Sequence, residues 1–540
     1  MFIMKRFLAL LLSVLLLTGC GAPAAETEPA QSRTQTALAQ ISQLGSSPDD
    51  NYRVWYEIFV YSFCDSNGDG IGDLPGVTSR LDYLQELGVN GIWLMPIHPS
   101  KSYHKYDVSN YNAIDPAYGS LDDFRELLAE CEKRDIHVIL DLVVNHTGSD
   151  HHWFTAACDY LRALPDGKEP NCDECPYLDY YHFSREQKNG FNRVEGTDWY
   201  YESMFSPDMP DLNLANGLVR QEIDAIMAYW LDMGVAGFRL DAAKEFYSGS
   251  AEKNIEVLSW IQETASAYKE DVYLVAEVWD SFNTITDYYR SGLTSIFDYP
   301  FGNSDGKIIT ILRNAGNPAQ VGTYATALEK ADKAYSGSNP NYIDAPFLSN
   351  HDVGRIASFC GKDESKTKLA GAMNLLMSGS AFLYYGEEIG MVGIGNDPSK
   401  RAPMYWNAAR DKGTTNPPPE CELPESYPFG SLEDQKDDDN SIYNYYRQAI
   451  AIRKALPVIS HGDTTAEAAL NTGCVSAFRK TWGDQECIIL MNIDASPAAA
   501  DLSGYDGWTL AAALSVSEEP ITQDGTTLNL PPYGVAILIP

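Results

Sequence analysis

Four apolar stretches of this 540-residue sequence end in side chains that are able to carry out acid–base or nucleophilic chemistry. Asp141 lies in DLVVNH, Arg239 and Asp241 lie in GFRLDAAK, and Glu277 lies in LVAEVW. Residues two apart on a strand point to the same face, so Arg239 would lie beside Asp241 and hold its carboxylate ionised, as a nucleophile requires. A second carboxyl group could protonate a leaving oxygen. The pattern therefore predicts hydrolysis of a neutral substrate by a pair of carboxylates.

Two histidines accompany these acidic residues. His146 ends DLVVNH, and His351 and Asp352 come directly after FLSN. For GFRLDAAK alone, an ion pair with a purely structural role is the alternative. Because a buried charge costs several kcal/mol unless it is paired, structural ion pairs rarely accumulate at the ends of four strands. We therefore expect one shared catalytic site.

Eight stretches have the composition of strands and would position these side chains. They span residues 54–63, 88–97, 136–144, 235–242, 271–279, 294–301, 344–350 and 380–388. Amphipathic stretches separate them, and in one of these Phe124, Leu127, Leu128 and Cys131 fall at helical spacing. Eight strands alternating with helices predict an α/β fold, a closed (β/α)8 TIM barrel with its active site at the carboxyl ends of the strands. A doubly wound sheet is the alternative, and the count of eight favours the barrel.

Two regions interrupt the alternation of the barrel, which we expect over residues 51–456. Residues 147–215 are too long for a simple loop, so we expect a small inserted domain after the third strand. Residues 457–540 contain short alternating stretches and turn signals such as SGYDGW and TQDGTT. They predict a separate antiparallel β-sandwich domain.

The N-terminus has the features of an export signal. Two positive charges precede the apolar stretch 7–17, which is too short to span a bilayer comfortably. The following Leu-Thr-Gly-Cys, ending at Cys20, resembles the lipobox of bacterial lipoproteins; an ordinary signal peptide is the alternative. The resemblance implies a signal peptide over residues 1–20 and acylation of Cys20, which would anchor the protein to the extracellular side of the cell membrane. Residues 21–50 are predicted to be a flexible tether, partly helical near 36–44.

Charge and cysteine content narrow the classes of partner. A formal net charge of −36 disfavours binding to nucleic acid or to anionic lipid head groups.

Without Cys20, nine of the ten cysteines remain, so at least one thiol must be free within the chain. Cys172 and Cys175 form a single CxxC with no second one nearby, which disfavours zinc and leaves a local disulfide or free thiols open.

The motifs together resemble a known family. DLVVNH, GFRLDAAK, EVW and SNHD, in this order, are similar to the four signature segments of the α-amylase family, glycoside hydrolase family 13. GVNGIWLMP, MPDLN and GSAFLYYGEEIGM resemble its accessory segments, and the resemblance runs from about Arg53 to Pro540. It implies that Asp241 is the nucleophile, that Glu277 is the general acid/base, and that Asp352 stabilises the transition state.

The resemblance also implies substrate contacts. Arg239, His146 and His351 would orient the nucleophile and hold sugar hydroxyls, and Tyr106 in SYHKYD would be the aromatic platform under the reacting sugar. Lys244 would contact a sugar on the leaving-group side, although Glu245 follows it where many amylases have histidine. The family retains anomeric configuration, which places the two catalytic carboxyl groups about 5–5.5 Å apart.

The segment DSNGDGIGD, residues 65–73, has the spacing of a metal loop. Its oxygen ligands would come from Asp65, Asn67, Asp69, the Ile71 carbonyl and Asp73, as in an EF-hand. Position twelve is glycine rather than glutamate, and the flanks are a strand and a helix, so we expect a structural Ca²⁺ loop like that of oligo-1,6-glucosidase relatives. A solvated acidic turn is the alternative.

A second calcium ligand is less well defined. Asn145 matches a calcium ligand of many amylases, but its partners cannot be identified from the sequence.

The expected activity is cleavage of α-1,4-glucosidic bonds in starch, maltodextrins and maltooligosaccharides. RAPMYW, residues 401–406, resembles a segment of oligo-1,6-glucosidases, whereas SYHKYDVSNY is more similar to lipoprotein-type α-amylases. An exo-acting α-glucosidase or neopullulanase and a 4-α-glucanotransferase therefore remain open. A surface starch-binding lipoprotein is the non-enzymatic alternative, and the presence of all three carboxylates disfavours it.

Overall fold

The computed structural model describes residues 32–165 and 167–540. The predicted signal peptide, with Cys20, and residues 21–31 of the predicted tether lie outside the described residues. None of the helices in the described part is long and apolar enough to cross a membrane.

A parallel sheet of seven strands forms the centre of the molecule, in the order β10-β1-β2-β3-β7-β8-β9. The strands are β1 (Val54–Ile58), β2 (Gly91–Leu94), β3 (His137–Leu142), β7 (Gly237–Leu240), β8 (Tyr273–Ala276), β9 (Ser295–Ile296) and β10 (Ala381–Tyr384). Nearly every residue in them is buried, as expected for parallel strands covered on both faces. The predicted TIM-barrel fold is confirmed.

The seventh predicted strand, 344–350, forms only an isolated bridge. Phe297 pairs with Ala345 in parallel, and the Phe382 amide donates a hydrogen bond to the Pro346 carbonyl at 2.8 Å. Proline has no N–H with which to continue a ladder. This segment therefore joins β9 to β10 through a few hydrogen bonds and closes the barrel without being a regular strand.

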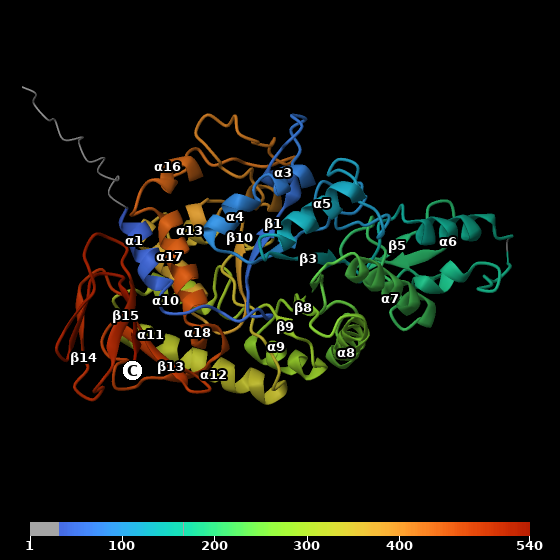
Figure 1. Cartoon of the computed structure of the whole chain (residues 1–540). Helices are drawn as coiled ribbons and strands as arrows, with labels where there is room; N and C mark the ends of the chain where they lie inside the picture. The colour runs from blue at the N-terminus through green and yellow to red at the C-terminus, as the bar shows by residue number, and fades with distance from the viewer. Residues whose placement is uncertain (1–31, 166) are drawn as a thin grey trace, which may run out of the picture.

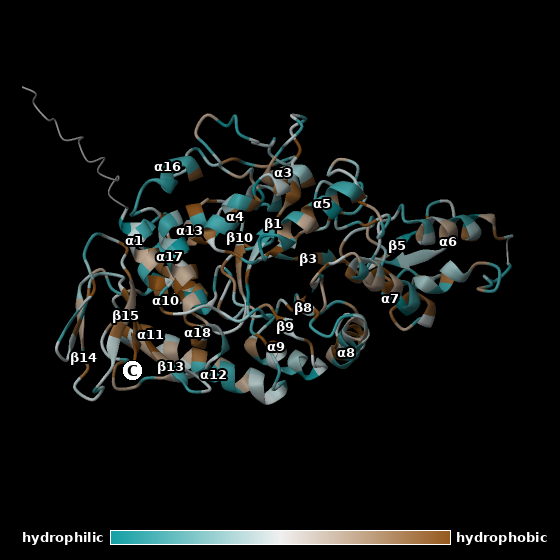
Figure 2. Ribbon diagram, viewed as in Figure 1, coloured by the Kyte–Doolittle hydropathy of each residue, from teal (hydrophilic) through white to brown (hydrophobic). Residues whose placement is uncertain are grey.

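Helices surround the barrel and cover it with their apolar faces. The main ones are α4 (Leu81–Leu87), α5 (Leu121–Glu132), α7 (Gly217–Asp232), α8 (Ala251–Tyr268), α12 (Thr323–Ser338), α14 (Glu364–Leu375) and α17 (Ile442–Ala455). Helix α5 shows how the sequence determines such an element: Ser120 and Asp123 form a capping box at its start, and Phe124, Leu127 and Cys131 face the core. Figure 2 shows hydrophobic residues concentrated in α10 (Lys307–Arg313), whereas α16 (Leu432–Lys436) is mainly hydrophilic.

The inserted segment after β3 folds as a small unit. It contains α6 (His152–Ala163), the 3-10 helix η1 (Pro176–Tyr180) and a three-stranded antiparallel sheet of β4 (Phe183–Ser184), β6 (Tyr200–Glu202) and β5 (Phe191–Arg193). In Figure 1 this unit projects to the right of the barrel. The nine cysteines of the described residues, including those of the CxxC, are all free thiols.

The C-terminal region lies on the opposite side of the barrel from the inserted unit (Figure 1). Its larger antiparallel sheet joins β11 (Asp463–Ala466), β12 (Val475–Trp482), β13 (Gln485–Asn492), β18 (Val535–Ile539) and β15 (Thr509–Leu514). Its smaller sheet joins β14 (Ala498–Asp501), β17 (Thr527–Leu530) and β16 (Thr522–Asp524). A separate apolar cluster with residues from both sheets, among them Leu490 and Leu528, forms the core of this antiparallel β domain.

The predicted tether contains a helix, as expected near 36–44, but from residue 32 onwards it is folded against the barrel rather than flexible. Helix α1 (Arg33–Ile41) packs against α17, and both Thr34 and Ile41 are buried. The Asp439 carboxylate accepts hydrogen bonds from the amides of Arg33 and Thr34 at 2.8 and 2.9 Å. The composition of this segment suggested disorder because it cannot fold alone, but docking on the barrel supplies the apolar surface that it lacks.

Candidate active site

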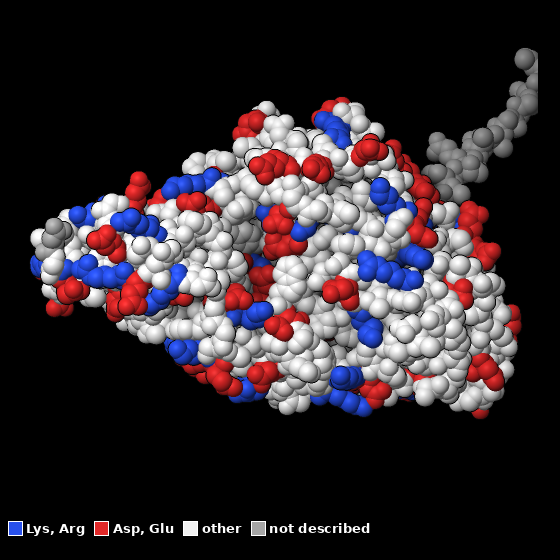
Figure 3. Space-filling view, turned by 180° about the vertical axis from the view of Figure 1, so that it is seen from behind, with Lys and Arg blue, Asp and Glu red and all other residues white. Residues whose placement is uncertain are grey.

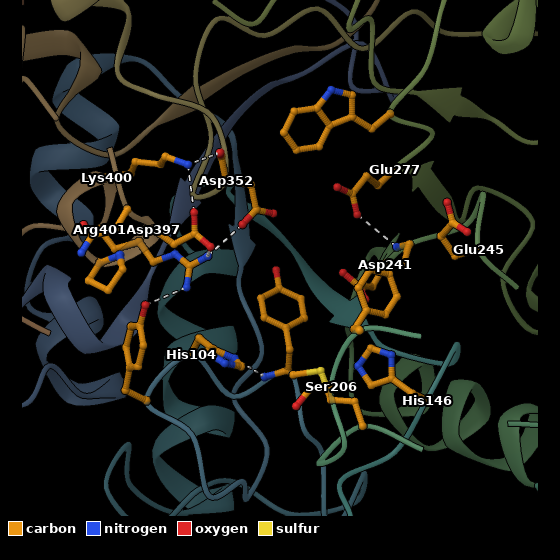
Figure 4. Close-up of a pocket in the computed structure, with 18 of the residues that line it drawn as sticks. His104, His146, Ser206, Asp241, Glu245, Glu277, Asp352, Asp397, Lys400 and Arg401 are labelled. Carbon is orange, nitrogen blue, oxygen red and sulfur yellow. Dashed lines mark hydrogen bonds and ion pairs between the residues drawn. The ribbon is translucent and has the colours of Figure 1, made fainter. Parts of the chain in front are cut away.

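The carboxyl ends of the barrel strands bring the predicted residues to one mouth. Asp241, Glu277 and Asp352 line a pocket of about 920 Å³. Other predicted residues that line it are Tyr106, His146 and Lys244. Arg239 and His351 are each 1% exposed and contact these carboxylates from below the pocket surface. Figure 4 shows Asp241 and Glu277 on one side of the pocket and Asp352 with Arg401 on the other.

Arg239 is the centre of the charge network. Its Nη1 donates to Oδ1 of Asp141 and to Oδ1 of Asp241, and its Nη2 donates to Oε2 of Glu277, each at 2.7 Å. Three carboxylates thus share one guanidinium, and the arginine does not neutralise them all. Burial raises the pKa of Asp241 and of Glu277, and that of Asp141 to about 7, while Arg239 acts in the opposite direction on each. The cluster is therefore able to hold a proton near neutral pH.

The predicted proton donor of this cluster is Glu277. Besides Arg239, it accepts the amide of Ala242 at 3.1 Å and the hydroxyl of Tyr299 at 3.3 Å. Ala242 has φ of +47°, a left-handed conformation that alanine rarely adopts and that costs of order 1–3 kcal/mol. The turn after Asp241 is strained, and its amide is directed at the Glu277 carboxyl group.

Asp352 has the opposite electrostatic environment. Nη2 of Arg401 donates to its Oδ1 at 2.8 Å, and Nε2 of His351 lies 2.9 Å from its Oδ2. Lys400 donates to its main-chain carbonyl at 2.7 Å. Burial opposes ionisation, but His351 and Arg401 hold the pKa of Asp352 well below its usual range. Asp352 is therefore ionised in the free protein.

Several residues of the site were not identified from the sequence. Arg401, Lys400 and Asp397 line the pocket, although the sequence analysis used RAPMYW only for comparison between subgroups. Glu57 on β1 lies behind His351 and is 1% exposed. A glutamate within the otherwise apolar VWYEI was the available signal for it.

Asp141 lies beneath the pocket and does not line it. It accepts hydrogen bonds from Trp93 Nε1 at 3.3 Å and from the Tyr106 hydroxyl at 3.0 Å, in addition to the one from Arg239. The first strand-end carboxylate of the sequence pattern therefore holds the Arg239 guanidinium and the Tyr106 hydroxyl in place.

The remaining predicted contacts flank the carboxylates. Nζ of Lys244 lies 3.1 Å from Asp280 and donates to the Trp279 carbonyl, close in sequence to Glu277. Nε2 of His146 is buried without a hydrogen-bond partner among the described residues, and burial lowers the pKa of His146 to about 4. A neutral imidazole with an unoccupied nitrogen is suited to bind a sugar hydroxyl.

The predicted calcium loop has the donor set of a hard-cation site. Asp65, Asn67 and Asp69 accept hydrogen bonds from amides two to five positions further on, at 2.7 to 3.1 Å. Asp73 caps α3 (Leu74–Thr78) by accepting the Gly76 amide. These oxygens, with no nitrogen or sulfur among them, are the ligand type that Ca²⁺ prefers, so the loop fits the ion by donor chemistry.

Two further observations bear on metals. Nδ2 of Asn145 lies 3.3 Å from a single carboxylate, Asp211. Within residues 32–165 and 167–540, one group of three acidic or histidine ligand atoms lies within 4.8 Å, namely Asp49, Asp135 and His137. That group is outside the predicted loop, and its two aspartates are exposed.

Comparison with known families agrees with this geometry. The family described as "Alpha amylase, catalytic domain" matches residues 57–462. The chain belongs to the α-amylase family. "Maltogenic Amylase, C-terminal domain" matches residues 470–537, within the C-terminal β domain.

Relatives with the same architecture cover most of the chain. Alpha-amylase 3 of Dictyoglomus thermophilum is 37% identical over 445 residues, 82% of this chain and 84% of that protein. The solved structure of Eubacterium rectale Amy13B is 43% identical, has a TM-score of 0.90, and aligns with 94% of this chain and 99% of its own. An oligo-1,6-glucosidase of Parageobacillus thermoglucosidasius is 29% identical over 82% of this chain and 90% of its own. This α-amylase family member is thus a glycoside hydrolase that acts on α-glucans.

Proposed function

We propose that the protein is an α-amylase that hydrolyses α-1,4-glucosidic bonds of starch, maltodextrins and maltooligosaccharides with retention of configuration. One observation carries the proposal. Asp241 and Glu277 are held by the two terminal nitrogens of the same Arg239 guanidinium, at 2.7 Å each, and face a pocket that Asp352 also lines. Two carboxyl groups that share one guanidinium beside a pocket support a mechanism in which both act on the same glycosidic bond.

The reaction has two displacement steps. In the first, Asp241 attacks the anomeric carbon while Glu277 gives its proton to the glycosidic oxygen, so the leaving sugar departs as an alcohol and a glycosyl ester forms on Asp241. In the second, ionised Glu277 takes a proton from water, the water oxygen attacks the same carbon, and the ester bond to Asp241 breaks. Two inversions give net retention.

Asp352 and the pocket walls act on the sugar that reacts. An ionised Asp352 accepts hydrogen bonds from sugar hydroxyls, and these strengthen as positive charge develops on the ring. Tyr106 and His146 line the same pocket. A volume of about 920 Å³ lies near the upper end of the usual range for ligand pockets and supports an oligosaccharide rather than a single sugar as substrate.

Cleavage of α-1,6 bonds is the alternative specificity, because one relative is an oligo-1,6-glucosidase. The similarity to an oligo-1,6-glucosidase favours exo-acting cleavage of α-1,6 bonds as the alternative activity. A 4-α-glucanotransferase would use the same carboxylates and differ only in the acceptor that reaches the glycosyl ester.

We further propose that Ca²⁺ binds the 65–73 loop in a structural role and that acylated Cys20 anchors the enzyme outside the cell membrane. The oxygen-only donor set supports the first proposal, and the export signal followed by a lipobox-like Leu-Thr-Gly-Cys supports the second. An enzyme held outside the cell could act on polymers too large to be imported.

A product time course tests the activity. Protein beginning at residue 32 is incubated with soluble starch, maltoheptaose and pullulan, alongside Asp241→Asn. We expect mixed oligosaccharides from starch at early times, an initial α-anomer by NMR, and no product from Asp241→Asn. Glucose alone would support an exo-glucosidase, and products longer than maltoheptaose a transferase. Silence of the unsubstituted protein on all three substrates would favour a starch-binding lipoprotein.

A further inference from the structure

Glu57 is a buried glutamate to which the hydrolytic mechanism assigns no role. It lies in the middle of β1, where the neighbouring residues are apolar and buried. Its side chain is 2% exposed, and its Oε1 lies 2.6 Å from Nδ1 of His351. A carboxylate this deeply buried is costly unless its partner carries a positive charge.

With Glu57 ionised, the hydrogen bonds around His351 require that charge. Burial raises the pKa of Glu57, and the positive charge of His351 counteracts this rise. Its Nδ1 faces Glu57, and its Nε2 faces Asp352 at 2.9 Å and the Tyr106 hydroxyl at 2.8 Å. The Tyr106 hydroxyl donates its own proton to Asp141, so it accepts from His351. Ionised carboxylates only accept hydrogen bonds, and a ring between two of them must therefore donate from both nitrogens.

We propose that Glu57 is a positioning residue that keeps His351 as an imidazolium and thereby keeps Asp352 ionised and correctly oriented toward the substrate. The inference rests on the transition-state role given to Asp352 in the proposed function. In this arrangement Asp352 lies between two cations, His351 and Arg401. Glu57 acts on the sugar only through His351 and is not among the residues that line the pocket.

Other charged and titratable groups near His351 do not replace Glu57. The anionic ones are Asp352, together with Asp141 on β3 and Asp241 after β7. The remaining ones are Arg239 on β7, Arg401 at the His351 carbonyl, and His104 and Tyr106 in the loop after β2. Among these groups only Asp352 forms an ion pair with the His351 ring, as Glu57 does from the other side. Burial opposes the charged ring, but Asp352 and Glu57 raise the pKa of His351 to about 9.

Glu57→Gln removes the charge and keeps the size. The amide oxygen still accepts a hydrogen bond from Nδ1–H of His351. Because a close opposite charge is lost, however, the pKa of the His351 imidazolium falls by about 1–3 units. Asp352 then loses the Nε2–H donor. We expect the alkaline limb of kcat/KM to move down by about 1–3 pH units, with a rate near the unsubstituted level on the acidic side.

The substrate for this measurement is α-maltosyl fluoride. Fluoride leaves without needing a proton, so the ionisation of Glu277 no longer sets the alkaline limb of the first step. The matched control is Glu388→Gln, because Glu388 is fully buried and accepts the Tyr56 hydroxyl at 2.9 Å, away from His351. The control should lower stability and leave the alkaline limb in place.

Two results would overturn the inference. The first concerns the pH at which kcat/KM for α-maltosyl fluoride falls. The inference fails if this pH is the same in Glu57→Gln as in the unsubstituted protein, or if it shifts no further than in Glu388→Gln. The other needs no variant: ¹⁵N NMR of the histidine side chains should show both His351 nitrogens protonated at pH 8, and a neutral ring there contradicts the proposal. If the unsubstituted enzyme cleaves neither α-maltosyl fluoride nor maltoheptaose, the proposed function itself fails.

Discussion

At the scale of single residues, burial and ion pairing give two carboxyl groups of one pocket opposite protonation states. Burial raises the pKa of Glu277, whereas His351 and Arg401 overcome burial and lower that of Asp352. The environment thus favours the protonated form of Glu277 and the ionised form of Asp352. This division of roles depends on Arg239 and His351, which lie beneath the pocket surface.

The raised pKa of Glu277 leads to a pH prediction. The group must be protonated to act as an acid, so activity on maltoheptaose should persist well above pH 4.3, the usual pKa of glutamate, and fall as the pH rises through the raised value. Glu277→Gln cannot donate a proton and should slow maltoheptaose cleavage by about 10²–10⁴-fold. The first step with α-maltosyl fluoride should be affected much less.

The control for this prediction is Glu387→Gln. Glu387 is also buried, and burial raises its pKa to about 8, but it lies outside the pocket. It should leave the ratio of the two substrate rates unchanged. An equal loss on both substrates in Glu277→Gln would remove Glu277 from the role of general acid.

The sequence predicts the three carboxylates together with Arg239 and His351, but it does not predict Arg401 or Glu57. Asp241 and Glu277 stand out because a charged residue at the end of an apolar stretch is rare without a function. Glu57 is conspicuous in its apolar stretch, but nothing near it or near Arg401 in the chain identifies their shared partner, because His351 lies 294 positions from Glu57 and 50 positions from Arg401. Only the closed barrel brings β1 beside the segment before β10.

At the scale of elements, the amino-acid composition predicts where the strands lie but not where each strand ends. The first predicted strand, 54–63, stops at Ile58 and continues as the short helix α2 (Val60–Phe63). In 344–350, Pro346 interrupts the ladder. Apolar periodicity detects burial, and buried helical turns and bridges have the same apolar composition as buried strands.

The loop between α2 and α3 supports a prediction about metal. Asp69 is exposed, and its carboxylate contacts only the Ile71 amide of its own loop. A ligand that binds only the folded state stabilises that state. If Ca²⁺ binds this loop, Asp69→Ala should therefore lower the melting temperature measured in Ca²⁺, and a chelator should no longer change the melting temperature. Activity at moderate temperature should be retained.

The comparison variant for this experiment is Asp122→Ala. Asp122 lies on α5 with its side chain 90% exposed, so its loss removes an aspartate of similar charge from the surface. It should keep the full difference between the melting temperatures with Ca²⁺ and with chelator. No such difference in the unsubstituted protein would identify 65–73 as a solvated acidic turn.

At the scale of the whole molecule, charge is spread rather than concentrated. Figure 3 shows acidic and basic side chains interspersed over most of one face, although the chain carries a net charge of −36. Such a surface keeps the protein soluble and offers no extended basic patch on this face for a polyanion.

The N-terminal arm, residues 32–52, connects distant parts of the fold and so belongs to this scale. Arg33 pairs with Glu518 of the C-terminal domain at 3.2 Å, and Asp50 pairs with His461 at 2.7 Å. Asp49 pairs with the buried guanidinium of Arg53 at 2.6 Å. The arm is thus part of the enzyme's folded structure, and an anchor at Cys20 would be joined to the enzyme by only the residues before Ser32.

Truncation tests this arm. A protein that begins at residue 32 should melt at a higher temperature than one that begins at residue 51, which lacks the buried Ile41 and leaves Arg53 without its partner. In the longer protein, Ile41→Ala should cost about 2–5 kcal/mol if the cavity does not collapse, whereas Gln40→Ala, on the exposed side of α1, should cost almost nothing. Equal melting temperatures for the two truncations would mean that the arm contributes nothing to stability.

The difference between the melting temperatures of the two truncated proteins should also depend on pH, and the direction of this dependence can be predicted. Burial acts to raise the pKa of Asp50, but the hydrogen bond with His461 lowers it below the usual value. A lowered pKa in the folded state adds stability above the unfolded pKa, about 3.9, and this stability is lost as the pH falls through the folded value. The gap between the melting temperatures of the two truncations should therefore narrow below about pH 4. Asp50→Asn in the longer protein should reduce that narrowing because the amide does not titrate, but a part should remain, since hydrogen bonds from the arm also lower the pKa of Asp439 to about 2.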